Sequence, residues 1–255
     1  MKAALISPTE FLPYVQPYSN YHLVLTHKII NDRRYQEFYR ERSKRGDFII
    51  LDNSALENKA KSRPLKDIVL AAVLIKPSVV ILPDYLFDSD RTLDELENAL
   101  RSPQLQFMRH VVPGVKLCAV AQGVDADDWL ECFSILNSSR NGIDILGIPM
   151  LTTHLFGSRY EALRKISRKI RKQVHLLGFW NGVPLEEIKR EREFDFVLGV
   201  DTSKPVRLAI VGKGLDAWLE LERDRDFIDR NHPKGVSLEL LKKNCEEFVQ
   251  LCKVR

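Results

Sequence analysis

Four polar side chains directly follow short apolar runs of the sequence, and their types suit chemistry at a purine attached to a sugar. Carboxylates accept hydrogen bonds from ring N–H and amino groups, and a glutamine side chain both donates and accepts. Paired carboxylates also suit substitution at a glycosidic carbon, where one attacks and another handles the proton. Sugar isomerases and phosphate-binding barrels are alternatives. The four residues are Asp52, Asp84, Gln122 and Asp201.

Asp201 is the first candidate for a nucleophile. In the stretch FDFVLGVDTSKPVR, the apolar run 194–200 predicts a buried strand, and Pro205 prevents its simple continuation. Asp201 then lies just past the carboxyl end of that strand, where parallel α/β folds bind ligands. A turn or helix cap is the competing structural interpretation. Asp195 is a second candidate, but it stands at the start of the strand, which is the opposite end of the sheet.

The elements that must position these residues alternate between strand-like and helix-like segments. Eight nearly all-apolar strands separated by helices predict a parallel sheet buried on both faces. We therefore expect one (β/α)8 TIM barrel over residues 1–255, a single domain with a C-terminal helical closure; the run 208–211 could replace the first strand. The expected strands are 3–7, 22–26, 48–51, 79–82, 115–121, 143–148, 175–178 and 194–200. The expected helices are 31–44, 65–75, 92–101 (with Thr92 as its N-cap), 127–136, 158–172, 184–190 and 238–252.

Composition limits the class of protein. The 255 residues are 44% hydrophobic, and no apolar run reaches the roughly 18 residues of a membrane span. The N-terminus has one Lys and a short apolar run that ends at Pro8, so it is a poor signal peptide. The four cysteines are scattered, with neither a CxxC pair nor a nearby His. These features predict a cytoplasmic protein without a membrane or metal partner.

The segment 158–172 is strongly basic. It holds seven cations and a single acid within fourteen residues, and the net charge of the chain is +4. Phosphate contacts on a nucleic acid would explain that density, although a solvated helix surface is the alternative. The predicted nucleic-acid ligands are Arg159, Arg164, Arg168 and Lys172, with Lys204 and Arg207 closer to the reacting nucleotide.

The strand-end motifs resemble the tRNA-guanine transglycosylase superfamily. They are Asp52 in ILDNSALE, Asp84 in VVILPDYLFD, Gln122-Gly123 in AVAQG, Gly147 in DILGIP, HLLG at 175–178, and FDFVLGVDTS. Their order covers residues 48–205 and is most similar to compact, often phage-encoded DNA-guanine transglycosylases that exchange guanine for a 7-deazaguanine.

The resemblance implies a role for each matching residue. Asp201 would be the nucleophile that forms a covalent glycosyl intermediate, and Asp52 the general acid/base for the departing and arriving base. The substrate would be held by Asp84, Gln122, Gly123, Gly147, Leu177, Gly178 and Ser203. Trp180 and Asn181 follow HLLG, and either lie near the bound sugar or only close the loop. No metal or organic cofactor is implied; the partners would be DNA and the free 7-deazaguanine base.

Two departures from the family's pattern favour DNA over tRNA. The tRNA enzymes follow the first Asp with Ser-Gly-Gly, whereas Asn53-Ser54-Ala55 follow Asp52 here. The tRNA enzymes also carry a C-terminal zinc site of three Cys and a His, and this sequence does not supply one after Asp201. The same pentosyltransferase reaction on tRNA, and a non-catalytic nucleic-acid-binding subunit, remain alternatives.

Overall fold

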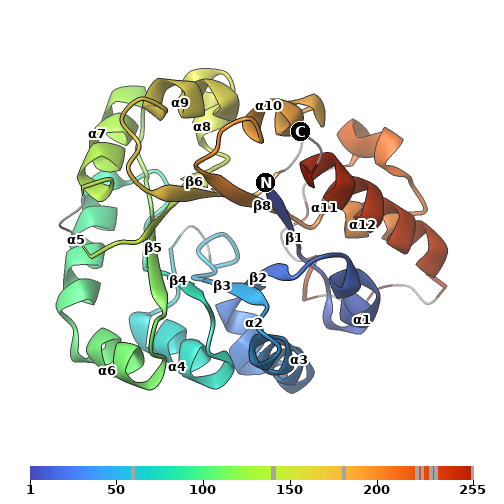
Figure 1. Cartoon of the computed structure of the whole chain (residues 1–255), viewed down its shortest axis with the longest axis horizontal. Coiled ribbons are helices and arrows are strands. Elements are labelled where there is room, and N and C mark those ends of the chain that lie inside the picture. Colours follow the sequence, from blue (N-terminus) through green and yellow to red (C-terminus); the bar gives the residue numbers. More distant parts are fainter. Residues whose placement is uncertain are drawn as a thin grey trace.

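Eight parallel strands form one sheet that curls into a nearly closed barrel, with the helices arranged around it (Figure 1). The computed structural model describes residues 1–58, 61–138, 142–179, 182–221, 224, 227–229, 232 and 235–253. Each strand pairs with its sequence neighbour from β2 to β8, and β1 pairs with β8. The strands are β1 (Lys2–Leu5), β2 (Tyr21–Leu25), β3 (Phe48–Asp52), β4 (Val79–Ile81), β5 (Lys116–Val120), β6 (Ile145–Pro149), β7 (Gln173–Leu177) and β8 (Val197–Thr202).

The predicted (β/α)8 barrel and all eight predicted strands are confirmed, with ends that differ by a few residues. The first apolar run is β1, and Leu208 lies in a helix, so the alternative first strand is excluded. Strands β1 and β2 contact each other at the seam of the barrel. No described helix is long and apolar enough to cross a membrane.

The outer ring is built from short helices. Those between β1 and β4 are η1 (Thr9–Phe11), α1 (Leu12–Val15), η2 (Gln16–Tyr18), α2 (Thr26–Asn31), α3 (Arg33–Lys44) and α4 (Leu65–Ile75). The next are α5 (Ser89–Arg101), α6 (Pro103–Val111), α7 (Ala126–Leu136), α8 (Thr152–Phe156) and α9 (Arg159–Ile166). The last are α10 (Glu186–Glu191), α11 (Lys204–Ile210), η3 (Leu215–Glu220) and α12 (Leu238–Lys253). The predicted C-terminal closure is α12, which contacts α1, α10 and α11 and so completes the ring (Figure 1).

Two predicted helices differ from the structure. Thr92 lies inside α5, because Asp88 is the N-cap and accepts from the Arg91 N–H; the Thr92 hydroxyl instead bonds the backbone of Tyr85. The basic segment 158–172 is helical only over Arg159–Ile166. Residues 167–172 turn back toward β7, so the segment does not present one continuous face.

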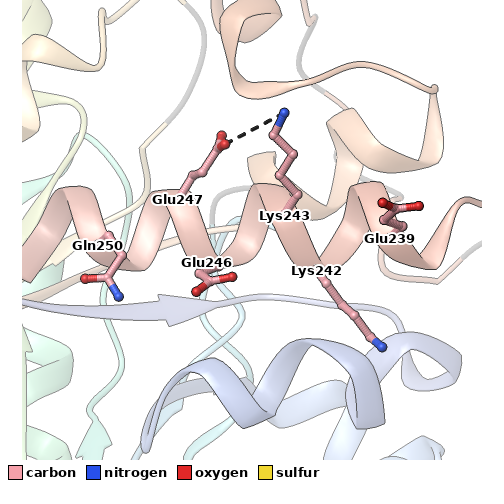
Figure 2. A pocket seen from close by; sticks show the side chains of 6 residues that line it. All are labelled: Glu239, Lys242, Lys243, Glu246, Glu247 and Gln250. Atoms are coloured by element: carbon pink, nitrogen blue, oxygen red, sulfur yellow. Dashed lines mark ion pairs between the residues drawn. The ribbon is translucent and has the colours of Figure 1, made fainter.

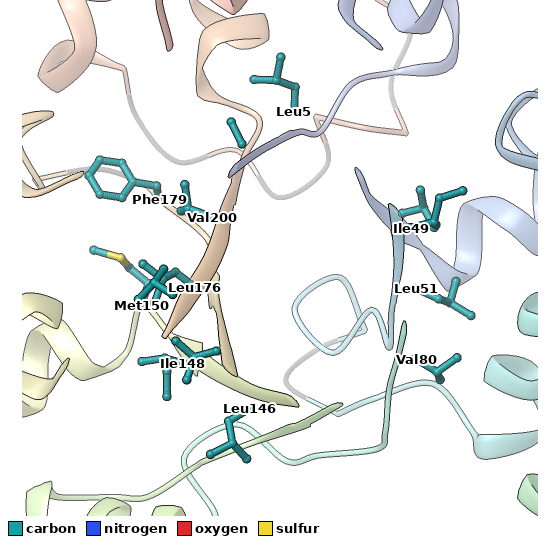
Figure 3. Close-up of a cluster of buried hydrophobic side chains, with 14 of the residues drawn as sticks. Leu5, Ile49, Leu51, Val80, Leu146, Ile148, Met150, Leu176, Phe179 and Val200 are labelled. Carbon is teal, nitrogen blue, oxygen red and sulfur yellow. The ribbon is translucent and has the colours of Figure 1, made fainter. Parts of the chain in front are cut away.

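The core has two layers, as alternation along each strand requires. One set of side chains faces the helices and includes Ile49, Leu51, Val80, Leu146 and Val200 (Figure 3). The other set fills the barrel interior and consists of Ala4, Tyr21, Leu23, Leu25, Ile50, Val79, Ile81, Cys118, Val120, Ile145 and Ile228. The apolar interior leaves the polar groups at the carboxyl end of the barrel.

Candidate active site

A cavity of about 440 Å³ opens at the carboxyl ends of the strands. Parallel strands bring their carboxyl ends to one mouth, so residues far apart in sequence meet there. Nine of the predicted site residues line this cavity: Asp52, Asp84, Gln122, Leu177, Gly178, Asp201, Ser203, Lys204 and Arg207. Glu57 and His154 line it as well.

Asp201 is held in one orientation by two donors on the same oxygen. The Gly178 backbone N–H lies 3.0 Å from Oδ1, and Nε2 of His175 lies 3.0 Å from the same atom. The described residues place no hydrogen-bond donor on Oδ2. The carboxylate is therefore fixed through Oδ1, and Oδ2 remains available to a ligand in the cavity.

His175 is itself oriented from the other side of the barrel. The hydroxyl of Tyr21, on β2, lies 2.8 Å from His175 Nδ1. With Asp201 as a carboxylate that only accepts, His175 carries its proton on Nε2 and accepts at Nδ1 from Tyr21. Burial raises the pKa of Tyr21 well above its usual range, so its hydroxyl stays protonated and can donate. Sequence analysis missed this chain, because Tyr21 and His175 are 154 residues apart.

A bulge in β8 aims Asp201 into the barrel. The pairing of β7 with β8 shifts between Val174 and His175. Leu198 packs in the barrel interior and Val200 faces the helices, so strict alternation from Leu198 would turn Asp201 outward. The extra residue at the bulge reverses that parity. Gly199 fits there because a Cβ would lie 2.6 Å from the Tyr21 ring.

Asp52 ends β3 on the interior side of the strand. Its Oδ2 accepts the Ser54 N–H at 2.8 Å, and Ser54 adopts a positive φ of 57°, which closes the backbone around the carboxylate. Burial and the nearby carboxylates of Glu57, Asp201 and Asp84 raise the pKa of Asp52 well above its usual range. A protonated Asp52 is the form that can act as a general acid.

Asp84 and Gln122 form one hydrogen-bonded unit on the same wall. Gln122 Nε2 donates to Asp84 Oδ2 at 2.6 Å, and Asn53 Nδ2 donates to Asp84 Oδ1 at 2.7 Å. The Phe87 N–H donates to Gln122 Oε1 at 3.3 Å, which fixes the amide. Burial raises the pKa of Asp84 to about 6, although both amides oppose the rise. This fixed carboxylate–amide pair can accept from and donate to a flat polar ligand.

The opposite wall is basic. Ser203, Lys204 and Arg207 follow β8 and line the cavity from the start of α11. Lys204 is 1% exposed and Arg207 is 8% exposed. Burial, and repulsion by Arg207, lower the pKa of Lys204 to about 8. The cavity therefore combines an acidic wall from β3 and β4 with cations from α11.

Apolar side chains complete the cavity. Leu177 ends β7 and packs toward Gly147, where an added Cβ would lie 2.9 Å from its Cδ1. Leu56 and Phe87 stand at the rim and are 40% and 52% exposed. A flat apolar ligand face could pack against these side chains.

Two predicted substrate-binding glycines lie outside the cavity wall. Gly147 is in the middle of β6, and its carbonyl accepts from the Ala121 N–H at 3.4 Å as part of the sheet. Gly123 packs against the start of α7, where a Cβ would lie 2.5 Å from the Trp129 nitrogen. Both glycines allow close packing of the barrel. Trp180 and Asn181 lie outside the described residues.

The prediction that Arg159 binds nucleic acid requires correction. Arg159 is fully buried; its Nε lies 2.7 Å from Glu191 Oε1 and its Nη2 lies 3.0 Å from Oε2. Its Nη1 donates to the carbonyls of Gly178 and Leu177 at 2.7 and 3.3 Å. Arg159 therefore supports, from behind, the loop whose Gly178 N–H holds Asp201.

The other predicted basic ligands lie away from the mouth. In a (β/α)8 barrel the helix after β6 runs back toward the amino ends of the strands. Arg164 on α9 is exposed and pairs with Glu161 at 2.8 Å, and Arg168 is exposed in the turn after α9. Lys172 donates to the Leu136 carbonyl at 2.7 Å immediately before β7. Arg168 and Lys172 thus lie toward the end of the barrel opposite the cavity.

A second hollow lies on the surface of α12 (Figure 2). Its lining residues all come from this one helix and are charged or polar, and Lys243 pairs with Glu247 at 3.9 Å. This hollow does not combine groups from several strands, in contrast to the cavity at the mouth. Within the described part of the chain, no group of His, Cys, Asp or Glu residues could hold a metal ion.

Comparisons with solved structures identify barrels of the same kind. A mutant tryptophan synthase alpha-subunit from Pyrococcus furiosus matches with a TM-score of 0.54 and 14% identity, over 95% of this chain and 91% of that chain. D-psicose 3-epimerase matches with a TM-score of 0.49 and 10% identity, over 98% of this chain and 97% of that chain. A xylose isomerase domain protein from Alicyclobacillus acidocaldarius matches with a TM-score of 0.48 and 12% identity, over 98% and 95%. No protein-family model and no curated protein matches the sequence.

The predicted membership of the tRNA-guanine transglycosylase superfamily is wrong. The similar structure with a TM-score of 0.54 is a tryptophan synthase alpha-subunit, a TIM-barrel enzyme of another kind, and no family model supports the resemblance. The motifs behind that prediction are short and lie at or near strand ends, and any TIM barrel places the residues at the carboxyl ends of its strands at one mouth. At these identities the comparisons establish the fold alone: the chain is a TIM barrel, similar in architecture to the tryptophan synthase alpha-subunit.

Proposed function

We propose that the protein is a base-exchange transglycosylase that replaces guanine in DNA with a 7-deazaguanine. The observation that carries this proposal is the meeting of Asp52, Asp201 and the Asp84–Gln122 pair in one cavity. Two carboxylates suit substitution at a glycosidic carbon, and the fixed carboxylate–amide pair suits a purine edge. The proposal rests on these groups and not on family membership.

The reaction would proceed in two displacements. Asp201 Oδ2 attacks the anomeric carbon, the C–N bond to guanine breaks, and Asp52 donates a proton to the departing base. The product is a glycosyl ester of Asp201, and Asp52 is now a carboxylate. The incoming base then attacks the same carbon with its ring nitrogen, the ester bond breaks, and Asp52 takes the ring proton. Two inversions give net retention at the sugar.

Each carboxylate has an environment suited to its role. The raised pKa of Asp52 keeps it protonated until guanine leaves. The hydrogen bonds of Asp201 from Gly178 and His175 fix one oxygen and leave the other for attack. Two acids in such different surroundings would suit a pentosyltransferase, with Asp52 as the acid and Asp201 as the nucleophile.

The base would be bound by Asp84 and Gln122. Guanine and a 7-deazaguanine share the same N1–H and amino edge, so one pair of side chains can read the outgoing and the incoming base. Above pH 6 Asp84 is mainly a carboxylate, because its pKa is about 6, and it then accepts from that edge. Leu177 would pack on the flat face of the base.

The polymer substrate imposes one further requirement. The cavity is enclosed by strand ends, so a base within a duplex must be unstacked and flipped to reach it. Lys204 and Arg207 line the side where the backbone of that nucleotide would enter. DNA is the proposed polymer and tRNA is the alternative. We also propose a cytoplasmic location.

The direct test is base incorporation. The protein is incubated with labelled guanine and either duplex DNA, single-stranded DNA or tRNA, and the label in each polymer is counted. We expect label in DNA. The Asp201→Asn variant should incorporate none and should form no denaturation-resistant protein–DNA adduct, because the ester cannot form.

A matched control tests the position of the nucleophile. Asp195 is exposed at the amino end of β8, so Asp195→Asn should retain exchange. Label in tRNA alone would reassign the polymer. Exchange lost in Asp195→Asn but kept in Asp201→Asn would refute the mechanism, and no label in any polymer would support the non-catalytic alternative.

A further inference from the structure

Lys204 is a buried cation in the cavity wall without a hydrogen-bond partner. Its side chain is 1% exposed, and within the described residues Nζ makes no hydrogen bond. The ammonium lies 4.5 Å from the centroid of the Trp218 ring. The attraction between an ammonium and a ring face offsets only part of the hydration free energy that a buried ammonium loses. Such a group is expected to have a ligand that completes its contacts.

A second cation lies close to Lys204 and adds to the cost of burying its charge. Arg207 lies three residues later on α11, lines the same cavity and is 8% exposed. Repulsion between the two cations adds to burial, and together they lower the pKa of Lys204 to about 8. An anion beside Lys204 would offset both effects on its ammonium.

Asp84, Asp52 and Asp201 have other partners than Lys204. Asp84 is bonded to Asn53 and Gln122, and Asp52 to the Ser54 N–H. Asp201 accepts hydrogen bonds from His175 and Gly178. Lys204 forms no ion pair in the described part of the chain, so its charge is available to an anionic ligand.

We propose that Lys204, with Arg207 beside it, is a binding site for the phosphate of the reacting nucleotide. The site follows β8, and (β/α)8 barrels frequently bind phosphate at the loops after strands 7 and 8. Lys204 and Asp201 line the same cavity, so one nucleotide would place its phosphate at Lys204 and its sugar at Asp201. The acidic wall then receives the base, and the basic wall receives the phosphate.

This inference rests on the proposed function in one respect: the phosphate is taken to belong to the nucleotide that reacts at Asp201. It also makes a claim of its own about ligand class. A guanine nucleotide should bind more tightly than the nucleoside, and the difference should come from Lys204. A lysine that only stabilises the fold would give neither result.

The experiment measures equilibrium binding by calorimetry. The ligands are deoxyguanosine, its 5′- and 3′-monophosphates, and inorganic phosphate, and the proteins are wild type, Lys204→Met and a control. We expect at least one monophosphate to bind wild type roughly ten- to a hundredfold more tightly than the nucleoside, as for a hydrogen bond to a charged group. Lys204→Met should abolish that difference and leave nucleoside binding unchanged.

The control is Lys213→Met. Lys213 follows α11, is exposed and pairs with Glu220 at 2.6 Å, so its removal should leave nucleotide binding unchanged. Thermal melting supplies a second readout. Lys204→Met replaces an unpartnered buried charge with an apolar chain, so the free protein should melt at a higher temperature than wild type. A lower melting temperature together with unchanged nucleotide affinity would overturn the proposal.

Comparing the ligands shows whether a failure concerns the phosphate site or the transglycosylase activity. Phosphate-dependent binding through Lys204 without base exchange would retain the phosphate site and reject the transglycosylase. Base exchange with equal binding of nucleoside and both nucleotides would reject the phosphate site and retain the transglycosylase. Tight binding of inorganic phosphate alone would assign the site to free phosphate and reject a nucleotide ligand.

Discussion

Arg159 and Lys204 are the two most deeply buried cations of the described chain, and their surroundings are opposite. Arg159 makes four hydrogen bonds through its guanidinium, two of them to the carboxylate of Glu191. Lys204 makes none with the described residues and lies beside a second cation. Both residues were predicted from the sequence to bind nucleic acid.

The two cations differ in how their charge is compensated: Arg159 is paired within the fold, whereas in our proposal Lys204 is paired by a ligand. Every donor of a buried charge must be satisfied if the charge is to stabilise the fold, and Arg159 comes close to that condition. An unpaired buried ammonium such as that of Lys204 is expected to destabilise the free protein, and in our proposal a bound anion offsets this cost. Burial alone therefore does not identify a structural residue; the hydrogen-bond partners do.

The largest expected effect on stability comes from breaking the Arg159–Glu191 ion pair. Arg159→Met should lower the free energy of unfolding by about 3–5 kcal/mol, because Glu191 would be left buried without its partner. Urea denaturation measures the loss. The sign is opposite to that expected for Lys204→Met, so the two variants test the comparison directly.

A double variant serves as the control for Arg159. Arg159→Met combined with Glu191→Met removes both charges and should recover most of the lost stability. If Arg159→Met alone costs less than about 1 kcal/mol, the ion pair does not stabilise the fold and the contrast with Lys204 fails.

A smaller effect concerns the pH dependence of stability. The pKa of Asp84 is about 6 in the folded protein and about 3.9 in an unfolded chain. Between these two pH values the folded protein binds the Asp84 proton more tightly than the unfolded chain does. Protonation of Asp84 therefore adds to the free energy of unfolding. This contribution is complete below about pH 4 and is lost as pH rises through 6. The loss is at most about 3 kcal/mol.

The measurement compares wild type with Asp84→Asn from pH 4 to 7. Asn does not titrate, so the fall in unfolding free energy should be shallower in the variant, whatever its absolute stability. Equal pH slopes would show that Asp84 does not carry the shift. The same variant should bind free guanine about tenfold or more weakly, because the base edge loses a carboxylate partner.

The smallest effect is expected at the exposed cations. Replacing Arg164 and Arg168 together with Gln should change stability by no more than about 0.5 kcal/mol and should leave the salt dependence of DNA binding unchanged. Lys204→Met should reduce the log–log salt slope by about 0.9 on duplex DNA or 0.7 on single strands. A reduced slope in the Arg164/Arg168 variant would mean that DNA follows α9.

The fold and nine of the residues that line the cavity could be predicted because they depend on local patterns. Apolar runs of four to seven residues predicted the strands, and alternation places Asp52 and Gln122 on the same side as Ile50 and Val120. The inward direction of Asp201 does not follow from alternation, because the bulge at Leu198–Gly199 reverses it.

Long-range pairing explains what the sequence could not reveal. Arg159 looked like part of a basic surface because its partner, Glu191, lies 32 residues away. The Tyr21–His175–Asp201 chain joins β2, β7 and β8 across the barrel. The missing partner of Lys204 is visible only once Trp218 and Arg207 are placed around it.

The pairing of β1 with β8 has a consequence for how the site comes into being. Ala4 is the ladder partner of Asp201, so residues almost 200 positions apart must meet before β8, which carries the proposed nucleophile, is paired on both sides. Contacts of such long sequence separation form slowly, because the intervening chain must first lose much of its freedom. During synthesis, β1 to β7 leave the ribosome before β8, which carries Asp201. We therefore expect the candidate active site to be completed late in folding, after most of the barrel has formed.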